Sequence, residues 1–153
     1  MSLQISQLTS YELGILFSIG YYNPLKQVLI LRHKNRYFLE QIQHHTNYNI
    51  YSQNSRTATQ YVLKIFSINI QELININWTF RNSEIRNIPT LTTYKDFLRA
   101  YIEMHSSLDY SIRYNGNKSK KYKALRLRIY GNKNIIESLN NIISTECNVN
   151  IKT

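Results

Sequence analysis

Two stretches of the chain have the apolar spacing and the start signals of buried helices. Residues 13–20 (LGILFSIG) are apolar nearly all round. Residues 9–12 (TSYE) before them form a capping box, with a hydroxyl at the cap and a carboxylate three residues later. Gly20 then stands where helices commonly end. Residues 97–105 follow a second capping box at residues 93–96 (TYKD), so we expect two helices in the core.

The segments between and after these helices alternate as strands do or show the spacing of surface helices. The first half predicts, in chain order, a turn over 21–24, a strand over 27–33, a helix over 35–44, strands over 49–52 and 60–67, a short helix over 70–76 and a connector over 77–91. The second half predicts a half-buried strand over 108–114, a turn at 115–117, a strand over 123–130, a helix over 134–143 and a short strand over 149–152.

The order of buried helix, hairpin, surface helix and strand thus occurs twice, which makes the chain an imperfect internal repeat. The clearest match sets residues 37–42 (YFLEQI) against residues 134–139 (NIIESL), because each follows a strand and carries glutamate between apolar pairs. With 153 residues, the chain is long enough for two small half-domains that share one core. We therefore expect an α+β fold in a single compact unit.

The charge of the chain narrows the classes of partner. Lys and Arg number 19 against 9 Asp and Glu, which gives a net charge of +10 and an isoelectric point near 9.7. A basic surface attracts polyanions, and such binding depends on salt through counterion release. Binding to an acidic membrane surface usually needs a basic amphipathic helix, and the sequence has neither a membrane-spanning apolar run nor a signal peptide. We expect a soluble, cytoplasmic protein with a nucleic-acid partner and no membrane partner.

Several kinds of enzyme and metal site find no support in the sequence. The single Cys147 excludes an internal disulfide and a cysteine-based zinc site. His44 and His45 are neighbours that point in different directions, so with His33 they are better explained as a solvated helix end than as a metal site. The glycine motifs of nucleotide-binding loops and the serine motif of hydrolases are missing from the sequence. We expect no resident cofactor.

Four segments carry a family resemblance. Residues 97–106 (FLRAYIEMHS) and 125–133 (LRLRIYGNK) are matched in the first copy by residues 12–20 (ELGILFSIG) and 32–39 (RHKNRYFL). In this order the segments resemble the motif helix and the strand-to-helix junction of LAGLIDADG homing endonuclease-like proteins. The resemblance implies a pseudo-symmetric pair of repeats, with two central packed helices flanked by antiparallel, saddle-shaped sheets that lie in the DNA major groove. The first repeat would span residues 1–90 and the second, truncated repeat residues 91–153.

The resemblance also implies a metal site, from which this sequence departs. In the family, an acid near the end of each motif helix binds the divalent metal used for DNA cleavage. The matching positions here are Ile19 and His105; isoleucine cannot ligate a metal, and histidine is a poor ligand for Mg²⁺. Glu103 should project from a different helix face, and Glu12 is better explained as a cap. We therefore expect a protein that binds duplex DNA without nuclease activity and without a metal.

Basic residues interleaved with aromatic ones are the strongest chemical feature of the chain. Arg113, Arg126 and Arg128 are expected on one face of the second-half hairpin and, with lysines at its tip, should form one basic ribbon that fits the major groove. The expected DNA-binding residues are Lys26, Arg32, Lys34, Arg36, Arg56, Lys64, Arg113, Lys118, Lys120, Lys121, Lys123, Arg126 and Arg128.

Two further expectations follow from residue size and spacing. Residues 20–28 leave little room for a full hairpin in the first half, so this half should offer less groove-reading surface and recognition should depend more on the second half. Gly14 and Ala100 are small residues in corresponding places of the two buried helices. We expect them at the helix–helix contact, because helices approach closely only where side chains are minimal.

Three other functions stay open at this point. An active metal-dependent DNA endonuclease would need a site built on Glu103 or His105, with Mg²⁺ as its cofactor. An RNA-binding, maturase-like protein could use the same scaffold and basic surface. A protein-interaction module would carry its charge for solubility alone. Two repeats in one chain remove the need for a dimer, so we expect a monomer.

Overall fold

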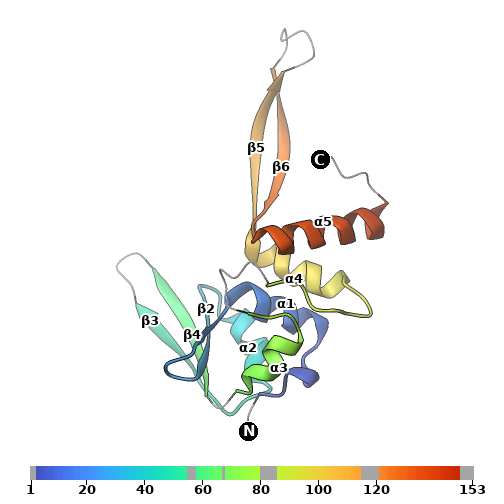
Figure 1. Ribbon diagram of the computed structural model, residues 1–153. Helices are drawn as coiled ribbons and strands as arrows, with labels where there is room; N and C mark the ends of the chain where they lie inside the picture. Colours follow the sequence, from blue (N-terminus) through green and yellow to red (C-terminus); the bar gives the residue numbers. More distant parts are fainter. Residues whose placement is uncertain (1–2, 55–57, 67, 80–85, 115–120, 149–153) are drawn as a thin grey trace.

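Two helices at the centre of the molecule, α1 (Ser10–Ile19) and α4 (Lys95–His105), pack against each other (Figure 1). The structure is a computed structural model that describes residues 3–54, 58–66, 68–79, 86–114 and 121–148. A four-stranded sheet belongs to the first half of the chain, and a two-stranded ribbon follows α4. The α+β fold with two central packed helices and antiparallel sheets is confirmed.

Helix α1 begins at the predicted capping box. The Thr9 hydroxyl accepts a hydrogen bond from the Glu12 N–H (3.3 Å), and the Glu12 carboxylate accepts one from the Thr9 N–H (2.7 Å). The helix ends where expected, although Gly20 is extended (φ −73°) and does not adopt the left-handed conformation of a typical glycine cap. A Cβ on Gly20 would collide with the Leu16 carbonyl oxygen. Glycine is therefore required here because the chain passes close to the last turn of α1.

The first-half sheet is antiparallel throughout, with the strand order β1-β2-β4-β3. Its strands are β1 (Gly20–Asn23), β2 (Val28–His33), β3 (Ile50–Asn54) and β4 (Thr59–Phe66). One face packs into the core, where the paired residues Leu31 and Leu63 are fully buried. Helix α2 (Tyr37–Gln43) contacts β2, β3 and β4, and the short α3 (Ile70–Asn75) adds Leu73 to the core.

The turn predicted over residues 21–24 was wrong, because β1 occupies this segment and pairs with β2. Tyr22 alternates inward and is 7 % exposed, so burial of its ring holds the segment as a strand. The chain turns over residues 24–27 instead, where Gln27 takes a left-handed φ of 47°. The expectation that residues 20–28 leave little room for a full hairpin was also wrong, because a four-residue β1 suffices to complete one with β2.

The second half consists of the antiparallel ribbon of β5 (Ser106–Tyr114) and β6 (Lys121–Ile129), followed by α5 (Lys133–Cys147). The ribbon projects away from the helices (Figure 1). Its apolar face was predicted to be half-buried, and this was wrong: Leu108, Tyr110 and Ile112 are 64–69 % exposed. Within the described ranges no element packs on this face beyond the base of the ribbon. The alternation of apolar and polar residues was therefore not enough to predict burial.

The boundaries of α4 and α5 differ from prediction in ways that have local causes. The second capping box does not form: Tyr94 is the residue before α4 and makes no side-chain cap, while its hydroxyl accepts a hydrogen bond from the Leu91 N–H (3.3 Å). Helix α5 is longer than predicted and is capped by Asn132, whose side chain accepts a hydrogen bond from the Ile135 N–H (2.8 Å). The strand predicted over 149–152 lies outside the described residues.

One core connects the two halves. Phe17 of α1 meets Phe97 of α4 edge to face, with ring centroids 5.6 Å apart. Trp78, from the segment after α3, is 1 % exposed and donates from Nε1 to the Leu16 carbonyl oxygen (3.3 Å). Ile135 and Leu139 join the same cluster from α5. None of the helices in the described part of the chain has the length and apolar character needed to cross a membrane.

Candidate nucleic-acid interface

The outer face of the four-stranded sheet carries basic and aromatic side chains together. The strand register places Tyr21, Ile30, Arg32, Tyr51 and Lys64 on this face, which we call the outer sheet face. Lys64 Nζ lies 5.2 Å from the centroid of the Tyr51 ring, a cation–π contact that holds the ammonium group over β3. Arg32, one strand away, is exposed. The sequence did not separate these two cations from the other basic residues of the first half, because only the register shows which positions share a face.

A hollow of about 520 Å³ adjoins the outer sheet face where α1 and α4 end. Its lining comes from both central helices and from the sheet, and consists of Ser18, Ile19, Tyr21, Ile30, Arg32, His33, Gln60, Met104 and His105. Ile19 and His105, the two positions that the family resemblance matched to metal-binding acids, therefore line the same hollow. Its charged group is the guanidinium of Arg32, so the hollow suits an anion better than a cation.

His105 joins the ends of the two central helices. Its Nε2 lies 2.8 Å from the Ser18 carbonyl oxygen, and because a carbonyl oxygen only accepts, Nε2 carries the proton and donates. The ring stacks on Tyr101 one turn earlier, with centroids 4.8 Å apart and planes 21° from parallel. These two contacts fix the imidazole with Nε2 turned to α1, as a bridge between α4 and α1.

The acidic residues of the central helices have other partners. Glu103 accepts a hydrogen bond from the Tyr11 hydroxyl (2.7 Å), and desolvation together with this bond raises the pKa of Tyr11 well above its ordinary value. Glu12 lies at the start of α1 and meets His45 Nε2 at 2.9 Å. Burial by itself would raise the pKa of Glu12, but the hydrogen bonds from Thr9 and His45 lower it below its ordinary value. Neither carboxylate reaches the hollow.

The residues at the helix ends do not fit the divalent metal that LAGLIDADG-like proteins use. Mg²⁺ prefers carboxylate and carbonyl oxygens in octahedral geometry. Ile19 offers a hydrocarbon surface, and the nitrogen of His105 that faces α1 is a donor. Across the described ranges, no group of three or more His, Cys, Asp and Glu side chains could hold a metal ion. His33 and His45 are held apart, since His33 bonds to the backbone of Asn35 and His45 to Glu12.

The polar face of the ribbon carries an ion-pair cluster that the sequence analysis missed. Arg126 donates from Nε and Nη2 to the two carboxylate oxygens of Asp109 (2.8 and 3.1 Å), and Arg128 Nη2 lies 2.8 Å from Oδ2. Asp109 lies on the same face as Arg113, four residues earlier along β5, and the register sets Arg126 directly opposite Asp109. The two arginines predicted to read DNA are therefore paired with one carboxylate in the free protein.

The lysines of the ribbon lie on the opposite face. Lys121 pairs with Tyr114 and Lys123 with Ile112, so both share the apolar face, with Lys121 Nζ 5.5 Å from the centroid of the Tyr114 ring. The register places Arg113, Arg126 and Arg128 on one face, as predicted, and Lys121 and Lys123 on the other, because a shift of one residue along a strand reverses the face. Three expected DNA-binding residues, Arg56, Lys118 and Lys120, lie outside the described residues.

The remaining predicted cations of the first half lie on connecting segments. Lys26 is exposed in the turn between β1 and β2, and Lys34 is exposed directly after β2. Arg36 precedes α2 and pairs with Glu40 one turn later (2.8 Å). These three residues do not share the outer sheet face with Arg32 and Lys64. They flank the sheet and could add contacts with a backbone phosphate.

Gly14 and Ala100 meet where α1 and α4 cross. A Cβ built on Gly14 would lie 2.7 Å from the Cβ of Ala100 and 2.7 Å from the carbonyl oxygen of Phe97. Real Cβ atoms do not approach other heavy atoms so closely, so α1 can occupy this position only with glycine at residue 14. The residues that the sequence paired by analogy are brought together in the structure.

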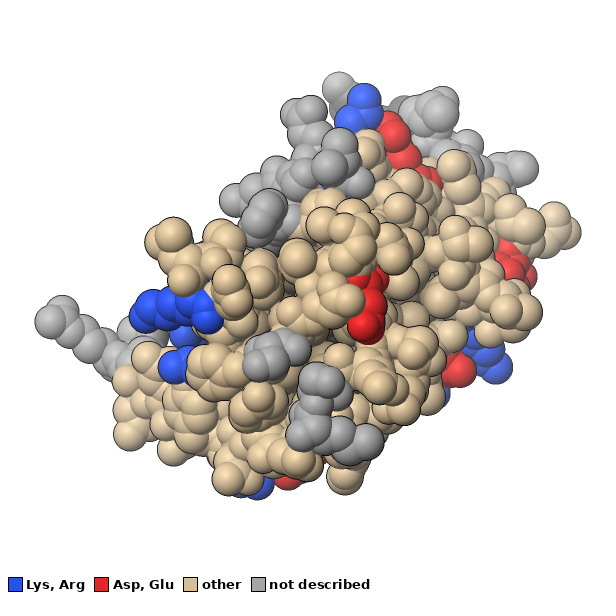
Figure 2. All heavy atoms as spheres, turned by 60° about the horizontal axis from the view of Figure 1, so that its bottom comes forward, with Lys and Arg blue, Asp and Glu red and all other residues tan. Residues whose placement is uncertain are grey.

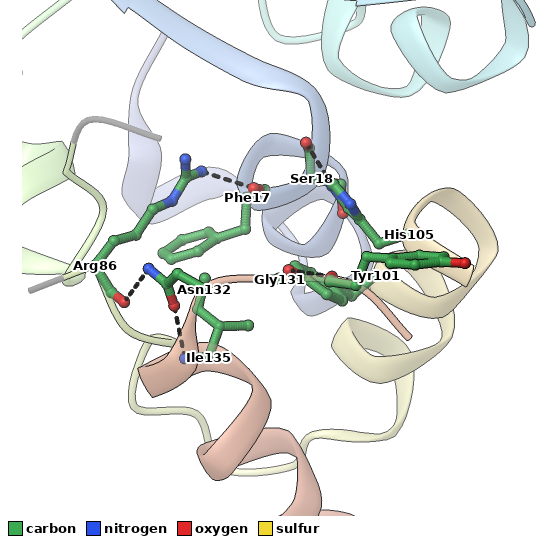
Figure 3. Close-up of a pocket in the computed structure, with 9 residues that line it drawn as sticks. Phe17, Ser18, Arg86, Tyr101, His105, Gly131, Asn132 and Ile135 are labelled. Carbon is green, nitrogen blue, oxygen red and sulfur yellow. Dashed lines mark hydrogen bonds between the residues drawn. The ribbon is translucent and has the colours of Figure 1, made fainter. Parts of the chain in front are cut away.

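A second hollow, of about 330 Å³, lies between α1, α4 and the start of α5 (Figure 3). Arg86 lines it and is only 2 % exposed. Its guanidinium donates to the Phe17 carbonyl oxygen (2.6 Å) and lies over the rings of Trp78 and Phe17, 4.8 and 5.4 Å from their centroids. Asn132 joins Arg86 to α5, since Nδ2 donates to the Arg86 carbonyl oxygen (3.0 Å). No periodicity marks Arg86, which the sequence analysis assigned to a connector.

One side of the molecule shows few cations among its described residues. Figure 2 shows the lower side of the molecule as seen in Figure 1, where uncharged side chains predominate and the lysines and arginines lie mainly toward the margins. The lower side is therefore a poor candidate for a polyanion surface.

Comparison with known proteins supports the fold. No family model and no curated protein sequence matches the chain. Among solved structures, an alanine variant of I-SmaMI superimposes with a TM-score of 0.53 at 10 % identity, over 93 % of this chain and 73 % of that one. The I-SmaMI LAGLIDADG homing endonuclease bound to cleaved DNA gives 0.51 at 9 % identity, over 90 % of this chain and 72 % of that one. The chain therefore has a LAGLIDADG-like fold.

Proposed function

We propose that this protein binds duplex DNA through the outer sheet face and the polar face of the ribbon, and that it does not cleave the DNA. The proposal depends most on one observation. The ends of the two central helices, which adjoin the outer sheet face, carry Ile19 and a His105 whose Nε2 donates to a backbone carbonyl. The fold resembles that of an endonuclease solved with cleaved DNA. The positions where the family resemblance implies metal-binding acids hold an isoleucine, which cannot ligate a metal, and a histidine, which is a poor ligand for Mg²⁺.

The cations of the two surfaces support DNA as the partner. Arg32 and Lys64 belong to the outer sheet face, and Arg113, Arg126 and Arg128 to the polar face of the ribbon. Each can meet a phosphate or a base edge, and with a net charge of +10 the whole molecule attracts a polyanion over several ångströms.

The shape of the ribbon favours duplex DNA over folded RNA. Two antiparallel strands fit the major groove of B-form DNA, whereas the major groove of A-form RNA is too deep and narrow for them. An RNA-binding protein would use the same cations, but it would not need a ribbon that fits the wide major groove of B-form DNA. Competition of a folded RNA against random duplex DNA at fixed salt separates the two, and we expect the DNA to win.

Arg32→Gln and Lys64→Gln test the outer sheet face. Each change removes one cation from this face, so each is expected to weaken binding to random duplex DNA and to reduce the slope of log K against log salt by about 1. Fluorescence anisotropy of a labelled duplex over a salt series measures both quantities. Arg99→Gln and Lys133→Gln serve as controls, because these exposed cations lie on α4 and α5 and belong to neither proposed surface. Equal slopes in all four variants would place the interface elsewhere.

A further inference from the structure

The two strands of the ribbon are rich in cations. They carry five Lys and Arg residues but a single acid, Asp109. This acid lies in the middle of the polar face, where the register sets it opposite Arg126, with Arg128 one position along on the same face. The three side chains are 36–44 % exposed, so water and ligands reach all of them.

Asp109 binds the guanidinium groups of both Arg126 and Arg128, the groups that would contact DNA. Arg126 gives it two donors in the parallel, bidentate arrangement, and Arg128 gives it a third. A guanidinium uses this same pair of donors for a phosphate or for the O6 and N7 acceptors of guanine. A phosphate that approaches the Nε–Nη2 edge of Arg126 must therefore displace the carboxylate, and one that approaches Arg128 stays close to the negative charge of Asp109.

We propose that Asp109 is a specificity-determining residue of the ribbon: it suppresses contacts of Arg126 and Arg128 with the phosphates of random DNA. The inference rests on the proposed function. Contacts with phosphates are independent of sequence and account for most non-specific affinity. In a matching site, the arginine that leaves Asp109 gains a bidentate pair of hydrogen bonds with a base edge, which offsets the loss of the carboxylate. The displaced carboxylate can accept a hydrogen bond from a cytosine amine. Asp109 thus lowers the affinity for random DNA more than the affinity for a target.

Asp109→Asn tests this role, with Glu137→Gln as the matched control. Asparagine keeps the size of the side chain and removes its charge, which frees the two guanidinium groups for phosphates. We expect random duplex DNA to bind several-fold more tightly at fixed salt, with a salt slope steeper by about 1 to 2. Glu137 is an exposed acid on α5, paired with Lys133 at 3.8 Å, so its replacement changes the net charge equally but frees no cation of the ribbon. Its slope is expected to equal that of the wild type.

The outcomes separate the inference from the function on which it rests. Equal slopes for Asp109→Asn and Glu137→Gln, or weaker binding by Asp109→Asn, would overturn the role of Asp109 while wild-type binding still supports the proposed function. Failure of the wild type to bind random duplex at low salt would refute both. A second variant keeps the proposal testable if Asp109→Asn fails to fold. Arg126→Gln, with Asp109 in place, should reduce the slope of log K against log salt by clearly less than 1, because the carboxylate already binds that guanidinium. A full loss of about 1 would contradict the proposal.

Discussion

Replacing Gly14 with valine is expected to destabilise the protein by about 3 kcal/mol or more, because overpacking a buried contact forces the surrounding backbone apart. The first carbon of the new side chain would already lie 2.7 Å from Ala100 Cβ and 2.7 Å from the Phe97 carbonyl oxygen. Ala100 and Phe97 belong to α4, so the two central helices would have to separate. Urea denaturation followed by circular dichroism measures the change in unfolding free energy.

The smaller change Gly14→Ala tells close packing apart from helix propensity. On an exposed helix surface, alanine stabilises by about 1 kcal/mol relative to glycine. At residue 14 we expect the opposite sign, and we expect Ala100→Gly in the same chain to restore only part of the loss, since the Phe97 oxygen still collides with the new Cβ. A stabilised Gly14→Ala variant would mean that the helices do not meet at this residue.

Arg86→Met is expected to cost about 3 to 5 kcal/mol. The change removes a hydrogen bond from a charged group and leaves the buried Phe17 carbonyl oxygen without this donor, a loss of about 1 to 3 kcal/mol. It also removes the cation–π contacts with Trp78 and Phe17, which for a desolvated cation contribute about 2 kcal/mol. Methionine fills much of the same volume, so an empty cavity is not the main cause. Denaturation in urea again gives the difference.

Arg99→Met is the matched control for Arg86→Met. Arg99 also lies over an aromatic ring, with its guanidinium carbon 4.6 Å from the centroid of Tyr11, but its side chain is 59 % exposed. An exposed cation–π contact contributes about 0.5 to 1 kcal/mol, so this change should cost no more than that. If the two variants lose equal stability, burial of the Arg86 guanidinium does not stabilise the contact between the segment after α3 and α1.

Most of the fold could be predicted from local patterns, because the strongest patterns coincide with burial. The apolar run after Thr9 forms a helix buried over residues 13–18, and the alternation in the second half forms the two strands of the ribbon. The predicted capping box shows the limit of local signals. Thr9 and Glu12 form theirs, whereas the second fails because Tyr94, not Thr93, is the residue before α4.

The errors have a common physical cause, since burial depends on what lies across from a segment. Residues 21–24 look like a turn until the pairing of β1 with β2 carries Tyr22 into the core. Leu108 and Tyr110 were predicted to be half-buried, yet they are exposed in the described structure. Alternation shows which face of a strand a residue lies on, but not whether another element covers that face. Arg86 lies in a segment without periodicity, so its burial follows only from the tertiary structure.

The positions at the helix ends of the candidate site could be predicted from the sequence, but the pairing of its charged side chains could be predicted less well. The resemblance to LAGLIDADG homing endonuclease-like proteins implied Ile19 and His105 as the positions of the metal-binding acids, and both line one hollow. The division of Arg126 and Lys123 between opposite faces of the ribbon follows from alternation once both strands are placed. The cluster of Asp109 with Arg126 and Arg128 requires the register between strands, which no single strand specifies.

The most direct test of the central claim is a salt titration of wild-type protein on random duplex DNA, run with and without Mg²⁺, with the DNA then resolved on a denaturing gel. We predict binding that weakens steeply as salt rises, equal recovery of intact strands in both conditions, and no dependence of strand integrity on the metal. Mg²⁺-dependent cutting would contradict the assignment of Ile19 and His105 as positions without metal ligands. Absence of binding at low salt would contradict the DNA-binding function itself.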